Sequence, residues 1–435
     1  MMSSRLYVRR VLLVAAATWL TACSTAATPA TPPPDTDLSS VIPPTAAIDA
    51  GALFTGGTLG TASGSPLRVG WVDIDNGSNS TANTQAVTAA VTMVNTELNG
   101  VGGRPIELVT CARQQQLRAC SAALAADPQI AVVITGNVGE FGAGLRENLG
   151  DLPRVGVIAT QDDEYRDPLN AFFVLGTPGI LRAAATWLTA GSPTGTTVEH
   201  VTILVTPRDS DVASTYAGER LESVGIEVRV VVVDDILPGE RVLRDVRTAV
   251  DALEPESAVV NMLGPTGCVA LAEALRAAGK DVLVVTSGLC SSKSVHDKLG
   301  DWTPGWIHIA GGPDLARYDQ DPQAALYRDR LRLYAGPEAD WTGHSSLSFA
   351  AVLNVVRILS GLAADRGDIS LSDRGLVARA LSSYQGPLFT GAGTANCGLD
   401  QQRPALCQHQ ARAYRYESGR HWVDVTGEAL LSVYP

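Results

Sequence analysis

The seven cysteines are the residues of this chain whose spacing points most directly to chemistry. Cys23 follows Leu20-Thr21-Ala22 at the end of an apolar run of roughly ten residues, which is too short to span a bilayer as a helix. Small residues before a cysteine, behind a positive segment with Arg5, Arg9 and Arg10, are typical of a bacterial lipoprotein signal. We therefore predict a signal peptide over residues 1–22 and lipidation of Cys23; the alternative is an ordinary secretory signal with an incidental cysteine.

The six other cysteines predict disulfides, because an even number in an exported chain is typical of oxidised pairs. Six cysteines allow fifteen pairings. The simplest prediction pairs neighbours in sequence, and the alternative is that one or more pairs are buried thiols. The predicted pairs are Cys111 with Cys120, Cys268 with Cys290, and Cys397 with Cys407.

The sequence carries no pattern for catalysis or for a metal centre. The six histidines show no HExxH or HxH spacing, and no GxSxG elbow or phosphate-binding GxxxxGK[ST] loop occurs. The stretch Asp73-Ile74-Asp75-Asn76-Gly77 is similar to a calcium loop, but its glycine comes one position early and the closing glutamate is missing. We therefore expect no metal, no cofactor and no enzyme activity.

Length and charge limit the class of protein further. A chain of 435 residues is long enough for two lobes of ordinary size. The formal net charge of −12 argues against binding to nucleic acid and against electrostatic adhesion to anionic lipid. Residues 23–65 are rich in Thr, Ala, Pro, Gly and Ser, and Pro32-Pro33-Pro34 and Pro43-Pro44 oppose helix and strand. We expect this segment to be a disordered tether.

The remainder alternates between short apolar runs and amphipathic segments. Buried strands are predicted at 67–72, 106–109, 130–134 and 155–159, and again at 201–205, 228–233, 258–263 and 282–285, with helices between them. Continuous apolar strands that alternate with helices predict parallel sheets covered on both faces. The two runs predict an α/β chain with two doubly wound lobes, and ligands bind such sheets outside the carboxyl ends of the strands.

The stretch from Leu98 to Leu108, with Asn99-Gly100 and Gly103-Arg104-Pro105, resembles a signature of the type I periplasmic-binding-protein family, in its leucine/isoleucine/valine-receptor branch. Other stretches agree in order along the chain; they are Val133–Gly136, Ala316–Asp319, Ser348–Val352, Gly391–Asp400 and Tyr414–Val423. The resemblance implies two lobes joined by three crossings, near Leu175, Ala310 and Phe389. Lobe one would comprise residues 66–175 and 310–389, and lobe two residues 176–309 and the closing hairpin and C-terminus at 390–435.

The same resemblance implies which loops meet a ligand. In lobe one these are the segment at Asn83 and the loops after the third and fourth strands; in lobe two they are the loops near Asp211, Thr266 and Leu289. The family's ammonium-pairing acid is missing near Leu289 and its aromatic lid near Thr266, so branched-chain amino acids are doubtful ligands. Asp209 or Asp211 could replace the missing acid, or each could cap a helix. The two lobe-one loops contribute Asn137, Gly139 and Glu140, and Thr160, Gln161, Asp162 and Asp163.

Charge at these loops suggests the kind of ligand. Backbone N–H groups at the Asn137 loop offer an anion site at a helix N-terminus. The carboxylates of Glu140, Asp162 and Asp163 oppose an anion and favour a cation or a hydroxyl-rich molecule, unless they only cap helices or face solvent. Asn83 could hydrogen-bond a sugar, amide or urea-like group, or serve only a polar turn.

The resemblance implies a function as well. It implies an extracytoplasmic solute-binding lipoprotein on the cell membrane that captures a small polar molecule, such as an amino acid or amide, by hinge closure and delivers it to an ABC permease. The alternative is a ligand-sensing or scaffold lipoprotein of the same fold that signals to a membrane partner.

Overall fold

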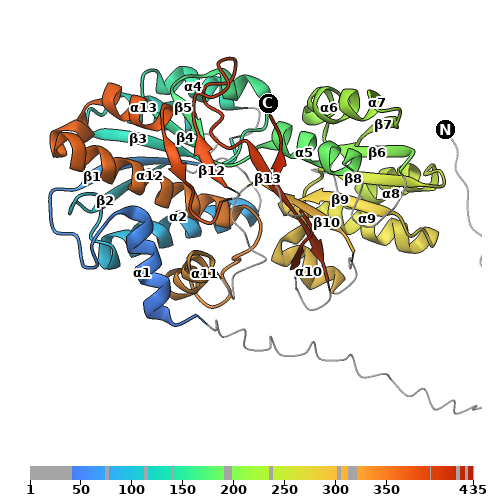
Figure 1. Ribbon diagram of the computed structural model, residues 1–435, viewed down its shortest axis with the longest axis horizontal. Helices are drawn as coiled ribbons and strands as arrows, with labels where there is room; N and C mark the ends of the chain where they lie inside the picture. Colours follow the sequence, from blue (N-terminus) through green and yellow to red (C-terminus); the bar gives the residue numbers. More distant parts are fainter. Residues whose placement is uncertain are drawn as a thin grey trace, which may run out of the picture. The chain divides into compact units, whose positions relative to one another are not determined.

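The computed structural model describes residues 42–73, 78–111, 116–138, 141–190, 198–234, 239–300, 305–311, 321–391, 393–417, 422–426 and 430–434. The predicted signal peptide, Cys23 and the first part of the predicted tether lie outside these residues. Within them the chain alternates between strands and helices as the apolar periodicity predicts (Figure 1).

The first sheet has five parallel strands in the order β2-β1-β3-β4-β5. Its strands are β1 (Leu67–Val72), β2 (Ile106–Cys111), β3 (Ile130–Thr135), β4 (Arg154–Gly156) and β5 (Asn170–Phe172). One face packs against α2 (Ser78–Glu97), α11 (Pro322–Ala335) and α12 (His344–Arg366); the other packs against α3 (Leu117–Ala126) and α4 (Gly142–Leu149). Both faces are buried, which explains why β3 is apolar from Ile130 to Ile134.

The second sheet follows the order β14-β13-β10-β9-β8-β6-β7, with β15 paired to β13. Its parallel strands are β6 (His200–Val205), β7 (Glu227–Val232), β8 (Ser257–Asn261), β9 (Leu283–Ser287) and β10 (Ile307–Ala310). The strands β13 (Gln410–Tyr416), β14 (Trp422–Asp424) and β15 (Leu431–Ser432) close its edge in antiparallel fashion. This edge is the predicted C-terminal hairpin.

Helices cover both faces of the second sheet as well. One core contains α5 (Thr177–Thr189), α6 (Ser210–Ala213) and α7 (Glu219–Glu222), the last two joined by a π-helical turn at Ser214–Gly218. The other contains α8 (Gly239–Asp251), α9 (Pro265–Ala278) and α10 (Lys293–Leu299). Two doubly wound lobes are therefore present, as the sequence predicts.

The segments that connect the lobes run side by side. The backbone N–H of Leu175, after β5, donates to the carbonyl of Gly311, after β10, at 3.0 Å. The chain's last passage comes later than the predicted crossing near Phe389. Leu388 and Phe389 lie in the first core, and Cys407 donates to the carbonyl of Phe172 at 3.0 Å, so the chain still follows the first sheet at residue 407 and joins the second at β13.

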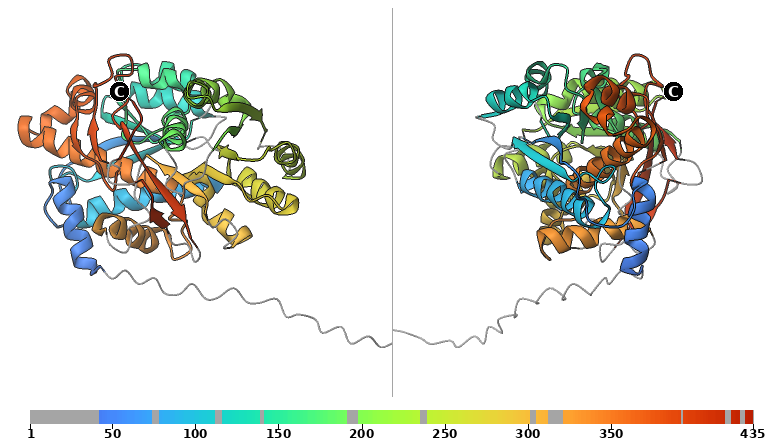
Figure 2. Two further views of the ribbon diagram at one scale, coloured as in Figure 1. Left: turned by 45° about the vertical axis from the view of Figure 1, so that its right-hand side comes forward. Right: turned by 90° about the vertical axis from the view of Figure 1, so that its left-hand side faces the viewer.

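A helix replaces residues 44–55 of the predicted tether, and Gly60, Ala62 and Gly64 donate backbone hydrogen bonds to the first lobe, so that prediction is wrong from residue 44 onward. Helix α1 (Pro44–Thr55) starts with Pro44 at its first position, where proline lacks only an N–H that has no helical partner. Phe54 is buried, packs edge-on against Phe389 at a centroid distance of 5.3 Å, and lies under the guanidinium of Arg357. This burial holds α1 beside α11 and α12 (Figure 2).

The remaining short elements and the cysteines complete the fold. Helix α13 (Arg374–Ser382) precedes a small hairpin of β11 (Gln385–Pro387) and β12 (Thr394–Asn396). The three predicted disulfides are formed, with Cα–Cα distances of 5.9 Å for Cys111–Cys120, 5.5 Å for Cys268–Cys290 and 3.9 Å for Cys397–Cys407. Among the described residues, α12 alone is long and apolar enough to cross a membrane, and most of it is buried in the first core.

Candidate functional site

Buried polar side chains gather near the carboxyl end of the first sheet. Asp73 directly follows β1 and is fully buried. Gly136, which follows β3, lies against it: a Cβ on Gly136 would come within 2.8 Å of the Asp73 carboxyl carbon, so only glycine fits there. Asn83, in the first half of α2, is 1% exposed, and its Oδ1 accepts no hydrogen bond from any residue that the structure describes. A buried amide oxygen without a donor is costly, and a bound molecule could supply that donor.

The loop after β4 binds a carboxylate of the protein itself. Glu164 Oε2 accepts hydrogen bonds from Thr160 N at 2.6 Å, Gln161 N at 2.9 Å and Thr160 Oγ1 at 3.2 Å. The predicted site residues Thr160 and Gln161 therefore direct their backbone donors at Glu164.

The other oxygen of Glu164 faces the helix that follows the β3 loop. Its Oε1 lies 4.0 Å from Arg146 Nη1, and a Cβ on Gly142, the first residue of α4, would lie 3.3 Å from it. Burial raises the pKa of Glu164, while the hydrogen bonds from Gln161 and Thr160 act in the opposite direction. Glu164 thus lies between the β4 loop and the first turns of α4.

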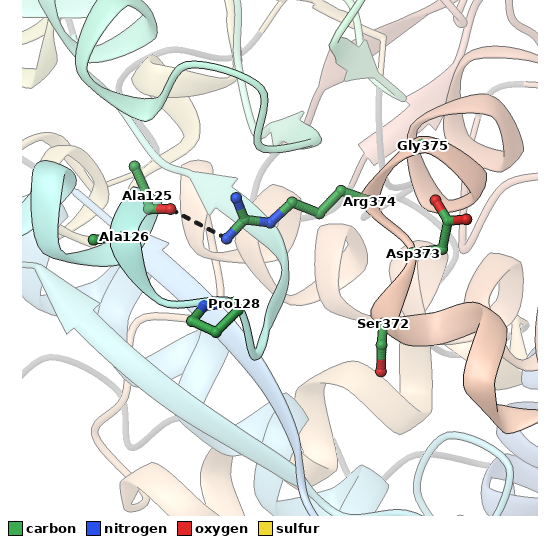
Figure 3. A pocket seen from close by; sticks show the side chains of 7 residues that line it. All are labelled: Ala125, Ala126, Pro128, Ser372, Asp373, Arg374 and Gly375. Atoms are coloured by element: carbon green, nitrogen blue, oxygen red, sulfur yellow. Dashed lines mark hydrogen bonds between the residues drawn. The ribbon is translucent and has the colours of Figure 1, made fainter.

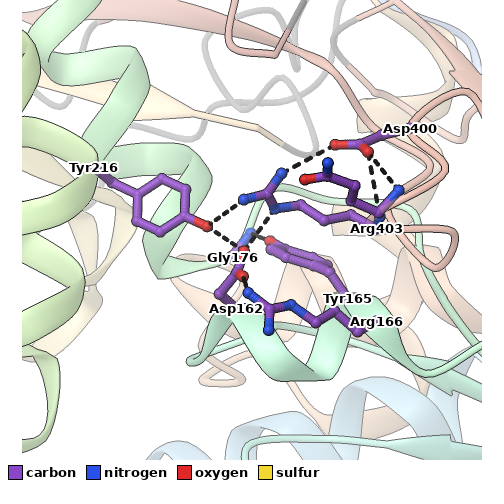
Figure 4. Close-up of polar contacts among 8 residues, drawn as sticks. Asp162, Tyr165, Arg166, Gly176, Tyr216, Asp400 and Arg403 are labelled. Carbon is purple, nitrogen blue, oxygen red and sulfur yellow. Dashed lines mark hydrogen bonds and ion pairs between the residues drawn. The ribbon is translucent and has the colours of Figure 1, made fainter.

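Asp162 belongs to a polar cluster that spans both sheets' loops (Figure 4). Its carboxylate accepts from Arg403 Nε and from Arg166 Nη2, each at 2.6 Å, and from the hydroxyl of Tyr216, which lies in the π-helical turn of the second lobe. Arg403 also donates to Asp400 at 3.2 Å and to the Tyr216 hydroxyl at 3.1 Å. The predicted ligand residue Asp162 is therefore engaged by partners within the protein.

Burial and charge shift the ionisation of this cluster. Burial raises the pKa of Asp162, but the hydrogen bonds from Tyr216 and Arg403 outweigh it, so the net shift is downward. Burial and the bond to Asp162 raise the pKa of Tyr216 to about 12. At neutral pH the cluster therefore consists of an ionised aspartate, a neutral tyrosine and a charged arginine, with Tyr434 5.7 Å beneath the Arg403 guanidinium.

The predicted residues of the second lobe are more exposed. Asp211 is exposed in the first turn of α6, and Thr266 is exposed in the first turn of α9. Leu289 is partly buried, and its N–H faces Ser287 Oγ at 3.4 Å. Asp209 is buried and accepts from Thr206 Oγ1 at 2.7 Å without making a side-chain cap, so its predicted capping role is wrong.

The loop after β3 is described only in part. Asn137 is partly buried, while Gly139 and Glu140 lie outside the described residues. Among the described residues no group of three or more His, Cys, Asp or Glu side chains is placed to hold a metal ion.

One open depression lies away from these loops, at the amino end of β3 (Figure 3). It measures about 450 Å³ and is lined by Ala125, Ala126, Pro128, Ser372, Asp373, Arg374 and Gly375. The only cation in the lining, Arg374, donates to the carbonyls of Ala125 and Asp127 at 3.2 and 2.6 Å. Parallel sheets bind ligands outside the carboxyl ends of their strands, and this depression lies at the amino end, so it is not the candidate site.

Solved structures share the fold of this chain, although no family model and no curated protein matches the sequence. An ABC transporter substrate-binding protein from Sphaerobacter thermophilus matches with a TM-score of 0.62 at 17% identity, over 82% of this chain and 96% of that one. A leucine-binding protein from Thermotoga maritima matches with a TM-score of 0.63 at 14% identity, over 84% and 99%. A solute-binding protein of an ABC transporter from R. palustris, in complex with benzoate, matches at 0.62 and 14%, over 85% and 97%.

This chain has the type I periplasmic-binding fold. The fold resemblance noted in the sequence is thereby confirmed. Within this fold, sequence reasoning missed Glu164, Arg403 and Tyr216 as partners of the loop after β4. Glu164 had a local signal, because a glutamate three residues after a helix-starting residue is typical of a capping box. Arg403 had none, since its partner Asp162 is distant in sequence.

Proposed function

We propose that this protein is a solute-binding lipoprotein on the extracytoplasmic face of the cell membrane, which captures a small polar molecule between its lobes and delivers it to an ABC importer. The observation that carries the proposal is the buried polar edge of the first sheet, where Asp73 and Asn83 are enclosed and the Asn83 oxygen lacks a described donor. Amino acids, amides and related molecules carry N–H groups that would complete that set.

Hinge closure is the proposed mode of capture. Leu175 and Gly311 bring two connecting segments together, so a few backbone torsions there could change the angle between the lobes. Gln161 Nε2 donates to the carbonyl of Arg208 at 3.4 Å, which brings the β4 loop against the first loop of the second lobe. A solute that contacts both loops would favour the closed arrangement in proportion to its preference for that state.

Thermal unfolding of the full chain against amino acids, amides, polyamines, sugars and short peptides tests this proposal. A solute that binds only the folded state adds about 2.7 kcal/mol of stability at a hundredfold excess over its Kd. We expect one chemical class to raise the unfolding midpoint. A panel without any response would contradict solute capture.

Lipid anchoring is tested separately through Cys23. We expect the protein to fractionate with membranes and a Cys23→Ser variant to leave them, because two or more acyl chains are needed for stable anchoring. A Cys23→Ser variant that stays in the membrane fraction would contradict the anchor.

A sensor or scaffold role is the second candidate, and two observations favour it. Asp162 is held by Arg403 and Tyr216, and the amides of Thr160 and Gln161 are held by Glu164, so several polar groups near the proposed site already have partners inside the protein. A partner other than a permease, captured by the anchored protein in the absence of any solute, would favour this candidate.

A further inference from the structure

Glu164 combines burial with a complete set of anion-binding donors. Its side chain is 7% exposed, and one carboxylate oxygen receives two backbone N–H groups and a hydroxyl from Thr160 and Gln161. Adjacent backbone N–H groups beside a hydroxyl can bind the carboxylate of a side chain or of a free solute. Hydrogen bonds to a charged acceptor are about twice as strong as bonds between neutral groups. These donors are therefore a carboxylate site that the protein fills itself.

A local helix cap accounts for only part of this arrangement. A capping box explains the bond from Gln161 N to Glu164, three residues later. It does not explain the shorter bond from Thr160 N, which precedes the helical turn, or the bond from the Thr160 hydroxyl. It also does not explain why the second oxygen faces α4, where it lies 4.0 Å from Arg146 Nη1.

The filled site lies at the edge that the proposed solute would approach. Thr160 and Gln161 follow β4, and Gln161 reaches the Arg208 carbonyl of the second lobe. Asp162, the next residue, binds Tyr216 of the same lobe. A solute enclosed between the lobes would thus meet a loop whose anion donors, the N–H groups of Thr160 and Gln161, already bind Glu164.

We propose that Glu164 is a specificity-determining residue: its carboxylate occupies the donors of the β4 loop and excludes solutes that would present a carboxylate there. This inference rests on the proposed function and narrows it to solutes that are neutral or cationic at this loop. Removal of the Glu164 carboxylate should convert the loop into a site for a free carboxylate.

The first experiment uses acetate as the probe and needs no knowledge of the natural solute. The unfolding midpoint of the full chain is measured in sodium acetate and in sodium chloride at equal ionic strength, for the wild type, Glu164→Ala and Asp163→Ala. Asp163 is the matched control, because it is an adjacent carboxylate that is 58% exposed and pairs with Arg146 at 2.6 Å. We expect a saturable rise of about 2 °C or more in acetate for Glu164→Ala alone.

The second experiment compares each carboxylate with its own amide: acetate with acetamide, benzoate with benzamide, and leucine with leucinamide. We expect the wild type to respond to no carboxylate more strongly than to its amide. Glu164→Ala should reverse that order, and Glu164→Gln, which keeps the shape of the side chain, should not accept the carboxylate as well as Glu164→Ala does.

The outcomes separate this inference from the proposed function. Equal midpoints of Glu164→Ala in acetate and chloride overturn the inference, whether or not any solute binds the wild type. A wild type that prefers a carboxylate to its amide overturns it too, and this result stands even if neither variant folds. A wild type without any solute response, combined with a response of Glu164→Ala to acetate, supports the filled site while contradicting solute capture.

Discussion

Asp162 and Arg403 are 241 residues apart in sequence, yet an ion pair of 2.6 Å joins them. Asp162 belongs to the loop after β4 of the first lobe, and Arg403 belongs to the last passage of the chain toward the second. Because Tyr216 of the second lobe bonds to both, this ion pair links the loops of the two lobes. We therefore expect this contact to stabilise both the folded chain and the position of one lobe against the other.

Loss of Arg403 should therefore cost stability. Arg403→Met leaves the partly buried Asp162 without its main charge partner, and we expect a loss of about 1–3 kcal/mol in the free energy of unfolding. The matched control is Arg166→Met, which removes another 2.6 Å bond to Asp162 from a side chain that is 64% exposed; it should cost less than about 1 kcal/mol. Urea titration measures the free energy of unfolding of both variants. Equal losses would contradict Arg403 as the main charge partner of Asp162.

Acid should destabilise the protein through His308. Burial and the neighbouring His296 lower the pKa of His308 to about 3, against an ordinary value near 6.5. Below about pH 6.5, His308 therefore binds a proton in the unfolded chain, whereas in the folded chain it binds one only near pH 3. Stability should fall as the pH decreases through this window, by up to about 1.4 kcal/mol per pH unit.

Urea midpoints between pH 7 and pH 4 test this dependence. The variant His308→Gln lacks the titrating group, so its stability should decrease less steeply with acid than that of the wild type. Identical slopes for the two proteins would assign the acid sensitivity to other groups.

Helix α1 should contribute to the stability of the first core. Phe54→Ala removes a ring that is 3% exposed and should cost about 3–5 kcal/mol. Its neighbour Leu53 is 83% exposed, so Leu53→Ala should be nearly neutral. Unfolding in urea compares the two, and a mild effect of Phe54→Ala would mean that α1 is not part of the folded body.

Asn83 should matter for solute binding and not for stability. Asn83→Leu replaces a buried amide, whose oxygen has no described donor, with an apolar side chain of similar shape, so stability should be unchanged or about 1 kcal/mol higher. The solute response in thermal unfolding should disappear.

The control for Asn83 lies on the same helix. Asn95 donates to the carbonyl of Ile106 at 2.9 Å and accepts from its N–H at 2.7 Å, so Asn95→Leu should cost about 1–3 kcal/mol while the solute response remains. An Asn83→Leu variant that is destabilised like Asn95→Leu would assign Asn83 a structural role.

The amino-acid sequence determined the elements of this fold. Apolar runs such as 130–134 and 201–205 could be recognised as strands because parallel strands buried on both faces leave no polar positions. Nearest-neighbour pairing of the cysteines was the simplest prediction, and the three disulfides confirm it, but the sequence alone left buried thiols open as an alternative. The prediction from sequence was wrong at Pro44, because a proline that opposes a helix in its interior can begin one. The same helix buries Phe54 in the first core.

The tertiary structure alone decided which groups are available to a solute. Thr160, Gln161 and Asp162 could be placed in a strand-end loop from the sequence, but their partners could not. Glu164 turns back onto the Thr160 amide, and Arg403 returns to Asp162 only after the chain has passed through both sheets. Local patterns record which side chains are buried and indicate a nearby cap such as that of Glu164. The pairing of Asp162 with Arg403 depends on the long-range path of the chain, which no local pattern encodes.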